Sequence, residues 1–154
     1  MTKPILNTHN KEDHPPAHTA EHILNGTMVK MFGCGRSYNA HVERKKSKCD
    51  YRLDREPTVE EIALIEKRVN EVIASNLDVT ESFLTQEEAA SIVDLSKLPD
   101  DASEMLRIVR VGDYDACACI GAHVANTSEI GTFKIISSDF DNGRWRLRWR
   151  IVKK

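Results

Sequence analysis

The chain has 154 residues, of which 40% are apolar and 30% are charged, and its formal net charge is −2. This length favours a single domain, and the composition excludes a disordered chain. The small net charge excludes a global field that attracts nucleic acid, so an RNA contact would need a local basic patch.

The first residues contain no apolar run of the kind found in signal peptides, and no segment approaches the roughly 20 apolar residues of a membrane span. We therefore expect a cytoplasmic protein without a membrane partner. Cysteines in that compartment are usually reduced, so a cysteine near a histidine is a candidate metal ligand or catalytic group. The chain has four cysteines: Cys34, Cys49, Cys117 and Cys119.

The chain should begin with a polar lead-in over residues 1–14, followed by one domain over residues 15–154. Two prolines at 15–16 suit the first turn of a helix, which should end near Phe32 with Gly33 as its stop. The helix has an apolar stripe at Leu24, Met28 and Met31. A glycine inside it, Gly26, would permit the close approach of a neighbour.

The predicted first helix contains the sequence HTAEH, in which His18 and His22 are four residues apart. Side chains at this spacing share one face of a helix and can hold one divalent ion. The same letters match the inverted zinc-peptidase pattern H-x-x-E-H, with Glu21 as a possible base. We favour the alternative interpretation of Glu21, as a solvated helix residue or as a partner of a ligand histidine.

Residues 37–42 and 48–53 alternate as strands do and predict a hairpin with a basic tip. The tip contains Arg44, Lys45 and Lys46, which either contact phosphates or form a solvated turn.

Thr58 and Glu61 form a capping-box pattern that opens a second helix. Its expected apolar face consists of Val59, Ile62, Ile65, Val69, Val72 and Ile73. After it we expect a strand over 77–84, a second capping box at 85–88 with a short helix to about Val93, a loop over 95–103 and a strand over 105–113.

Near the other end, the sequence CIGAH places Cys119 and His123 at the spacing of the first pair. Three histidines and one cysteine suit zinc by ligand type and number. Four protein ligands would close a structural site, whereas catalysis beside the ion requires an open position, and the spacing leaves both possible. If the preceding segment is extended, Cys117 points the same way as Cys119, as a spare ligand, a lining group or an inert buried thiol.

The chain should end with a strand over 132–138, a turn over 141–143 and a strand over 144–152. The last strand alternates arginines, including Arg146 and Arg148, with apolar residues. These arginines either contact phosphates or protect an edge strand. The predicted fold class is α+β, with a largely antiparallel sheet and helices packed on it.

Three segments resemble the editing domain of alanyl-tRNA synthetases. HTAEHIL resembles its HTATHLL-type motif, and CIGAHVANTSEIGTFKIIS resembles its CGGTHV-NTGEIG-FKI-S signature. The segment YRLDREPTVEEIALIEKRVNEVI is similar to the RLDF segment and long helix of that domain. The resemblance covers residues 17–151 and identifies the chain as similar to the short, free-standing AlaX-type trans-editing proteins.

The resemblance implies the α+β fold of the threonyl- and alanyl-tRNA synthetase editing domain and hydrolysis of mischarged tRNA-Ala, mainly seryl- or glycyl-tRNA-Ala. It implies one zinc ion per chain, held by His18, His22, Cys119 and His123, with a water as nucleophile and no separate protein base. The polar residue that senses the serine hydroxyl in the family corresponds to Asn39, and Gly121 is the other expected substrate-binding residue, as part of the pocket wall. The sequence departs from the family at Ile120-Gly121-Ala122, where the family has Gly-Gly-Thr, and at Ser128.

With this family in mind, Arg44, Lys45, Lys46, Arg146 and Arg148 become expected contacts to the tRNA, and no DNA partner is expected. Two other functions fit the same residues. One is a non-catalytic zinc module that binds tRNA or a synthetase, and the other is a small zinc peptidase.

Overall fold

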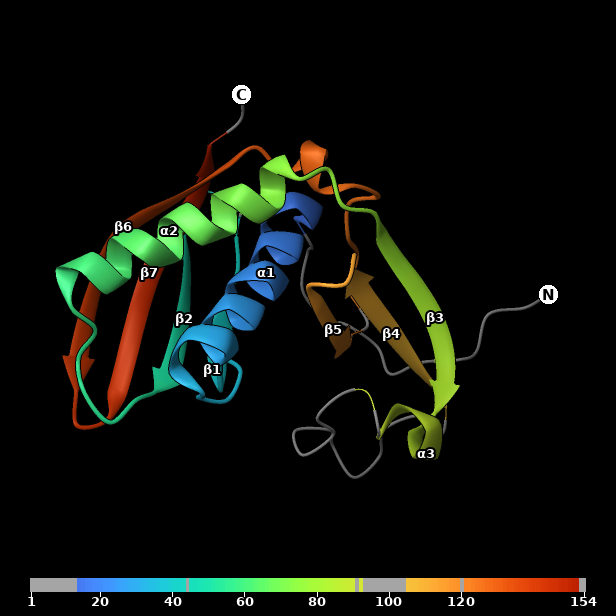
Figure 1. Ribbon diagram of the computed structural model, residues 1–154, viewed down its shortest axis with the longest axis horizontal. Helices are drawn as coiled ribbons and strands as arrows, with labels where there is room; N and C mark the ends of the chain where they lie inside the picture. The colour runs from blue at the N-terminus through green and yellow to red at the C-terminus, as the bar shows by residue number, and fades with distance from the viewer. Residues whose placement is uncertain (1–13, 44, 91, 93–104, 120, 153–154) are drawn as a thin grey trace.

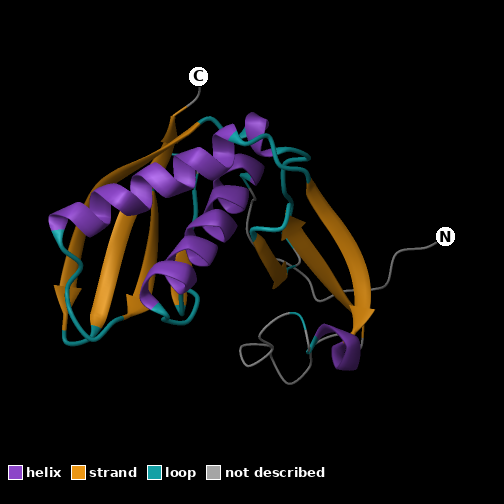
Figure 2. Cartoon of the chain, viewed as in Figure 1, coloured by secondary structure: helices purple, strands orange, loops and turns teal. Residues whose placement is uncertain are grey.

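A computed structural model of the chain describes residues 14–43, 45–90, 92, 105–119 and 121–152. These residues form an α+β fold with two antiparallel sheets and three helices (Figures 1 and 2). A four-stranded sheet has the order β1-β2-β7-β6, and a three-stranded sheet has the order β3-β4-β5. The predicted fold class is confirmed, although two sheets replace the single sheet that was expected.

The helices are α1 (Pro15–Phe32), α2 (Val59–Ala74) and α3 (Gln86–Ala89), with a 3-10 turn at Thr127–Glu129. The strands are β1 (Asn39–His41), β2 (Ser47–Arg52), β3 (Val79–Thr85), β4 (Met105–Val111), β5 (Asp115–Ala118), β6 (Thr132–Asp141) and β7 (Arg144–Val152).

Helix α1 has the limits that its sequence predicts. Pro15 and Pro16 occupy its first positions, and the backbone N–H of Ala17 donates to Nδ1 of His14. Gly33 ends the helix in the left-handed conformation at φ 66°, which glycine adopts without a steric penalty. A Cβ at Gly26 would lie 3.1 Å from Oδ1 of Asp115, so the predicted close approach to a neighbour is confirmed and the neighbour is β5.

The main core lies between the four-stranded sheet and the helices α1 and α2. Figure 1 shows α2 crossing this sheet and α1 lying between the two sheets. The apolar side of β7 contributes Trp145, Leu147 and Trp149, all fully buried. This confirms the alternation predicted for the last strand, with its arginines on the opposite face.

The three-stranded sheet reaches α1 through the β4–β5 turn. There the hydroxyls of Thr27 and Tyr114 lie 2.6 Å apart, and Lys30 lies over the Tyr114 ring. A smaller apolar cluster of Ala89, Leu106 and Ile108 lies at the other end of this sheet. The contacts of Thr27 and Lys30 hold the β4–β5 turn against the last turns of α1.

Several predicted limits were wrong. The short helix α3 ends at Ala89 instead of near Val93, and β4 ends at Val111 because Gly112 adopts φ 50° in a turn. β6 runs beyond residue 138 to Asp141, with a bulge between Ile135 and Ser137. The segment before Cys119, whose extended conformation was left open, is the strand β5 over residues 115–118.

Two predictions about side-chain surroundings also fail. Val59 is 80% exposed instead of lying on the apolar face of α2, because it is the first residue of the helix and need not face the core. β7 is an inner strand between β2 and β6, so its arginines do not protect a sheet edge. The expected loop over 95–103 and the lead-in before His14 lie outside the described residues. Of the described helices, none is both long and apolar enough to cross a membrane.

Candidate metal centre

The structure brings together the two pairs predicted from spacing. Each of His18, His22, Cys119 and His123 offers one donor atom, and these four atoms lie within 4.8 Å of one another. The histidines of the first pair come from α1, and the second pair follows β5, about a hundred positions along the chain. The rings of His18 and His123 are stacked at 4.2 Å between centroids, and His22 meets His123 edge-on at 4.4 Å.

His18 is fixed by the loop that follows Cys119. Its Nδ1 lies 3.1 Å from the carbonyl oxygen of Ala122. Because a carbonyl only accepts, Nδ1 carries the proton, and Nε2 is left to act as a ligand. Nε2 in turn lies 3.3 Å from Sγ of Cys119.

Gly121 packs directly on the His18 ring. A Cβ at position 121 would fall 2.6 Å from Nδ1 of His18 and closer still to Cε1, which no side chain tolerates. The backbone of Gly121 does not lie in the left-handed region, so its conformation does not demand glycine. The close contact with the His18 ring does. The sequence comparison named Gly121 as a pocket residue without revealing this role.

His123 is oriented by the buried Thr19, one residue after His18. The Thr19 hydroxyl lies 2.9 Å from Nδ1 of His123 and accepts from the backbone N–H of Val124 at 3.2 Å. With Nδ1 engaged by Thr19, Nε2 is the nitrogen of His123 suited to ligation.

His22 is the most enclosed of the four ligands, at 3% exposure. Its Nδ1 lies 3.7 Å from Oδ2 of Asp115, whose side chain is 5% exposed. Arg36 donates to both oxygens of Asp115, at 2.6 and 3.1 Å. At 3.7 Å the contact between His22 and Asp115 is longer than a hydrogen bond, and Nδ1 of His22 has no hydrogen-bond partner within the described residues. Asp115 nevertheless occupies the place of a carboxylate that orients a ligand histidine, and Arg36 holds it there.

Arg107 of β4 holds the Cys119 loop in place. Its Nη1 donates to the carbonyl oxygens of Cys119 and Gly121, and its Nε donates to Glu81 of β3. The backbone N–H of Cys119 donates to the Arg107 carbonyl at 3.0 Å. The loop is thus fastened to the three-stranded sheet on both sides of the Cys119 ligand.

The electrostatics of the metal-free site follow from burial. Burial lowers the pKa of His22 well below its usual value, with smaller contributions from His123 and Arg36, so this ring is neutral and able to ligate. Burial raises the pKa of the Cys119 thiol to about 12. A cation would be needed to deprotonate this thiol at neutral pH.

The donor set fits a zinc ion in chemistry and approximate size. Two ligands at about 2.0–2.3 Å from a tetrahedral ion lie about 3.4–3.6 Å apart, close to the separation of His18 and Cys119. The other separations reach at most 4.8 Å, so small side-chain movements would close the four donors on an ion.

Glu21 and Cys117 lie beside the cluster. Oε1 of Glu21 is 3.9 Å from Nε2 of His18, and burial raises the pKa of Glu21 to about 7, opposed by Arg36. The Cys117 thiol contacts the carbonyl of Ala118 at 3.3 Å and is not among the four clustered donors. Both positions agree with a role next to the ligands, which stays a prediction.

The other predicted contacts lie on the four-stranded sheet. The Asn39 amide donates to Asp50, and its substrate role stays a prediction. Arg146 donates to both oxygens of the buried Asp50, and Arg148 donates to Asp139. Of the basic tip, Lys45 and Lys46 are exposed, whereas Arg44 lies outside the described residues, as does Ile120 of the altered loop.

Sequence reasoning missed Thr19, Asp115, Arg36 and Arg107. One signal was present for Asp115, because residues 115, 117 and 119 of an extended segment share a direction. The others act through contacts between distant segments, which spacing does not reveal.

Comparisons with known proteins agree with this geometry. Residues 106–146 match the family model described as "Threonyl and Alanyl tRNA synthetase second additional domain". This segment includes Cys119 and His123. Among curated proteins, an alanine–tRNA ligase of Fervidobacterium nodosum is 35% identical over 121 residues, covering 78% of this chain and 14% of the relative.

Two other alanine–tRNA ligases give similar matches. That of Staphylococcus epidermidis is 34% identical over 83% of this chain and 15% of the relative, and that of Bacillus cereus is 31% identical over 88% and 16%. The chain therefore spans about one-sixth of the length of the curated relatives that it matches.

Proposed function

We propose a function from one premise: the chain is a member of a family related to the editing domain of alanyl-tRNA synthetases. The proposal is that it is a zinc-dependent hydrolase that removes a wrong amino acid, serine or glycine, from tRNA-Ala in the cytoplasm. The observation that carries it is the convergence of His18, His22, Cys119 and His123 on one point. The family relation supports a role connected with tRNA, and the donor cluster supports the hydrolytic chemistry.

The four clustered residues would hold one zinc ion. A bound zinc ion supplies Lewis acidity and lowers the pKa of a nearby water, which is the nucleophile that ester hydrolysis needs. The protein's own part is to present neutral imidazoles. The Ala122 carbonyl and Thr19 fix the rings of His18 and His123, Asp115 faces the ring of His22, and burial keeps His22 uncharged.

No side chain is assigned as a separate base. Glu21 is half-buried, with a pKa near 7, and lies next to His18, so we assign it a supporting role beside the ligands. This separates the proposal from the peptidase alternative, in which Glu21 is the base. Glu21→Gln should retain zinc and most deacylation, whereas a peptidase would lose its activity.

Selection for serine requires a group that detects one hydroxyl. A pocket built for alanine cannot strongly reject an analogue that merely adds a hydroxyl, so a second site must recognise that group. Asn39 can donate and accept for this purpose, and Gly121 would form the adjacent wall. In the structure the Asn39 amide already donates to Asp50, which would orient its carbonyl oxygen.

The tRNA contacts in this proposal are Arg44, Lys45, Lys46, Arg146 and Arg148. Each would meet backbone phosphates and contribute to affinity without reading sequence. The pairing of Arg146 with Asp50 and of Arg148 with Asp139 reduces the free charge of these two, so the lysines at the tip should contribute more.

A deacylation panel tests the function. Zinc-loaded protein is mixed with seryl-, glycyl- and alanyl-tRNA-Ala, and release of the amino acid is followed. We expect rapid release of serine or glycine and much slower release of alanine. The alternative of a non-catalytic module that binds tRNA or a synthetase predicts salt-sensitive tRNA binding with no turnover on any substrate.

A further inference from the structure

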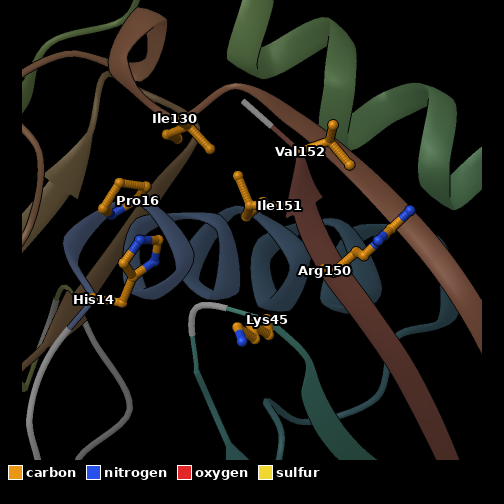
Figure 3. A pocket seen from close by; sticks show the side chains of 7 residues that line it. All are labelled: His14, Pro16, Lys45, Ile130, Arg150, Ile151 and Val152. Carbon is orange, nitrogen blue, oxygen red and sulfur yellow. The ribbon is translucent and has the colours of Figure 1, made fainter. Parts of the chain in front are cut away.

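A cavity of about 740 Å³ lies beside the start of α1, outside the four-donor cluster. Four parts of the chain surround it: the start of α1, the tip between β1 and β2, the residue after the 3-10 turn, and the end of β7. Its lining residues are His14, Pro16, Lys45, Ile130, Arg150, Ile151 and Val152, shown together in Figure 3. This volume is within the range of small-ligand sites.

The lining combines an apolar side with basic groups. Pro16, Ile130, Ile151 and Val152 supply the apolar surface. Lys45 and Arg150 supply two positive charges, and none of the seven lining residues is acidic. Figure 3 shows His14 and Arg150 on opposite sides of the cavity, with Lys45 between them and the Arg150 guanidinium pointing away from His14.

Lys45 and Arg150 differ from the other arginines of β7 in their salt-bridge partners. Arg144 and Arg148 pair with Asp139, and Arg146 pairs with Asp50. Within the described part of the chain, no carboxylate makes a salt bridge to Lys45 or Arg150. The residue opposite Arg150 on β6 is Lys134, another cation. Like charges in this position are unfavourable unless an anion lies near them.

The position relative to the donor cluster is fixed by α1. His14 borders the cavity, and His18, one helical turn later, belongs to the cluster, so the two lie about 6 Å apart along the helix axis. One nucleotide spans a distance of this order. A chain of nucleotides whose last ester lies at the cluster could therefore place a neighbouring unit in the cavity.

We propose that this cavity binds one nucleotide of the unpaired 3′ end of an RNA, with the base on the apolar side and its phosphate at the basic rim that Lys45 and Arg150 form. Cationic side chains attract the phosphate, and burial of the base face supplies affinity without sequence reading. The proposal rests on the proposed function for the identity of the RNA, because an unpaired CCA end is common to all tRNAs.

Binding of a fluorescent CCA trinucleotide to the full, zinc-loaded chain tests the proposal without any hydrolysis step. Val152→Glu places a negative charge beside the cavity at an exposed strand end, and should weaken binding about fivefold or more. Val59→Glu is the matched control, because the same change is made at an exposed site on α2. It should bind like the wild type.

A double variant, Lys45→Ala with Arg150→Ala, tests the phosphate contact. The slope of log affinity against log salt should shrink by about 0.7, since the pair neutralises one phosphate and each neutralised phosphate of a single strand contributes about 0.7. The double control Lys67→Ala with Arg68→Ala removes the same charge from an exposed stretch of α2 and should keep the wild-type slope.

Other outcomes of these experiments decide whether a nucleotide binds in the cavity. Absence of CCA binding to the wild type would overturn the proposal, as would equal binding by Val152→Glu and by the wild type. Tighter binding of AMP or inorganic phosphate than of CCA would instead identify a free-anion site and also overturn it. If the chain hydrolyses no mischarged tRNA but CCA binding is still lost in Val152→Glu, the cavity stands and the proposed function fails.

In a deacylation assay the same variants should raise KM with kcat little changed, because they leave the four donors intact. A fall in kcat at unchanged KM would contradict the placement of a nucleotide in the cavity.

Discussion

The backbone of Gly121 lies against the ring of His18, so that a Cβ at position 121 would fall 2.6 Å from Nδ1 of that ring. The contact joins the loop after Cys119 to the helix that carries the first two ligands. It therefore makes the geometry of the donor cluster depend on a residue that has no donor of its own.

Gly121→Ala should displace His18 and weaken zinc binding by about tenfold or more, with little change in the rest of the fold. The affinity is measured by competition with a chelating dye. Gly35→Ala is the matched control, because a Cβ at that position meets nothing within 4 Å. Equal zinc affinities for Gly121→Ala and Gly35→Ala would show that the His18 ring can move aside without weakening zinc binding.

Asp115→Asn should weaken zinc binding by about 10- to 100-fold, because His22 loses the carboxylate that orients it. It should also lower the free energy of unfolding by about 3 kcal/mol, since the Arg36 charge loses its partner. Urea unfolding of the metal-free protein separates the two effects. The exposed pair Arg55–Glu61 provides the control, as Glu61→Gln should leave the zinc affinity unchanged and the unfolding free energy nearly so.

Zinc uptake should release about one proton per ion near neutral pH, because the Cys119 thiol is protonated in the metal-free site and must be a thiolate to ligate. Affinity should accordingly rise with pH. Calorimetry in two buffers of different ionisation enthalpy measures the proton count. The release should vanish in Cys119→Ala and persist in Cys34→Ser, and a wild-type count of zero would mean that Cys119 is not a ligand.

The Asp50–Arg146 pair should make the protein sensitive to acid. The Arg146 guanidinium holds the pKa of Asp50 below its usual range in the folded state. Because the folded-state pKa is the lower one, the pair stabilises the fold above pH about 4 and is lost as the pH falls through that folded-state value. Asp50→Asn should flatten the dependence of unfolding free energy on pH between about 5 and 3. An unchanged slope would show that the pair contributes nothing to folding.

The sequence predicted the parts of the fold that depend on local chemistry. The limits of α1 follow from Pro15-Pro16 and Gly33, and α2 begins with the capping box of Thr58 and Glu61. The alternation of β7 predicted which of its faces is buried. The division into two sheets was not predicted, because strand pairing between distant segments has no local signal.

The candidate site likewise combines features that the sequence predicted with features that depend on tertiary contacts. Spacing alone suggested two pairs of donors, and the structure places them together. The residues that orient them depend on tertiary contacts, as when Arg107 of β4 reaches the carbonyls of Cys119 and Gly121. Val59 failed for a different reason, since an apolar residue at the first position of a helix need not face the core.

The rate of serine release from seryl-tRNA-Ala, compared with alanine release from alanyl-tRNA-Ala, tests the central proposal most directly. Zinc-loaded wild type should release serine much faster than alanine, and His22→Ala should lose both zinc and this activity. Intact seryl- and glycyl-tRNA-Ala after incubation with fully zinc-loaded protein would contradict an editing function.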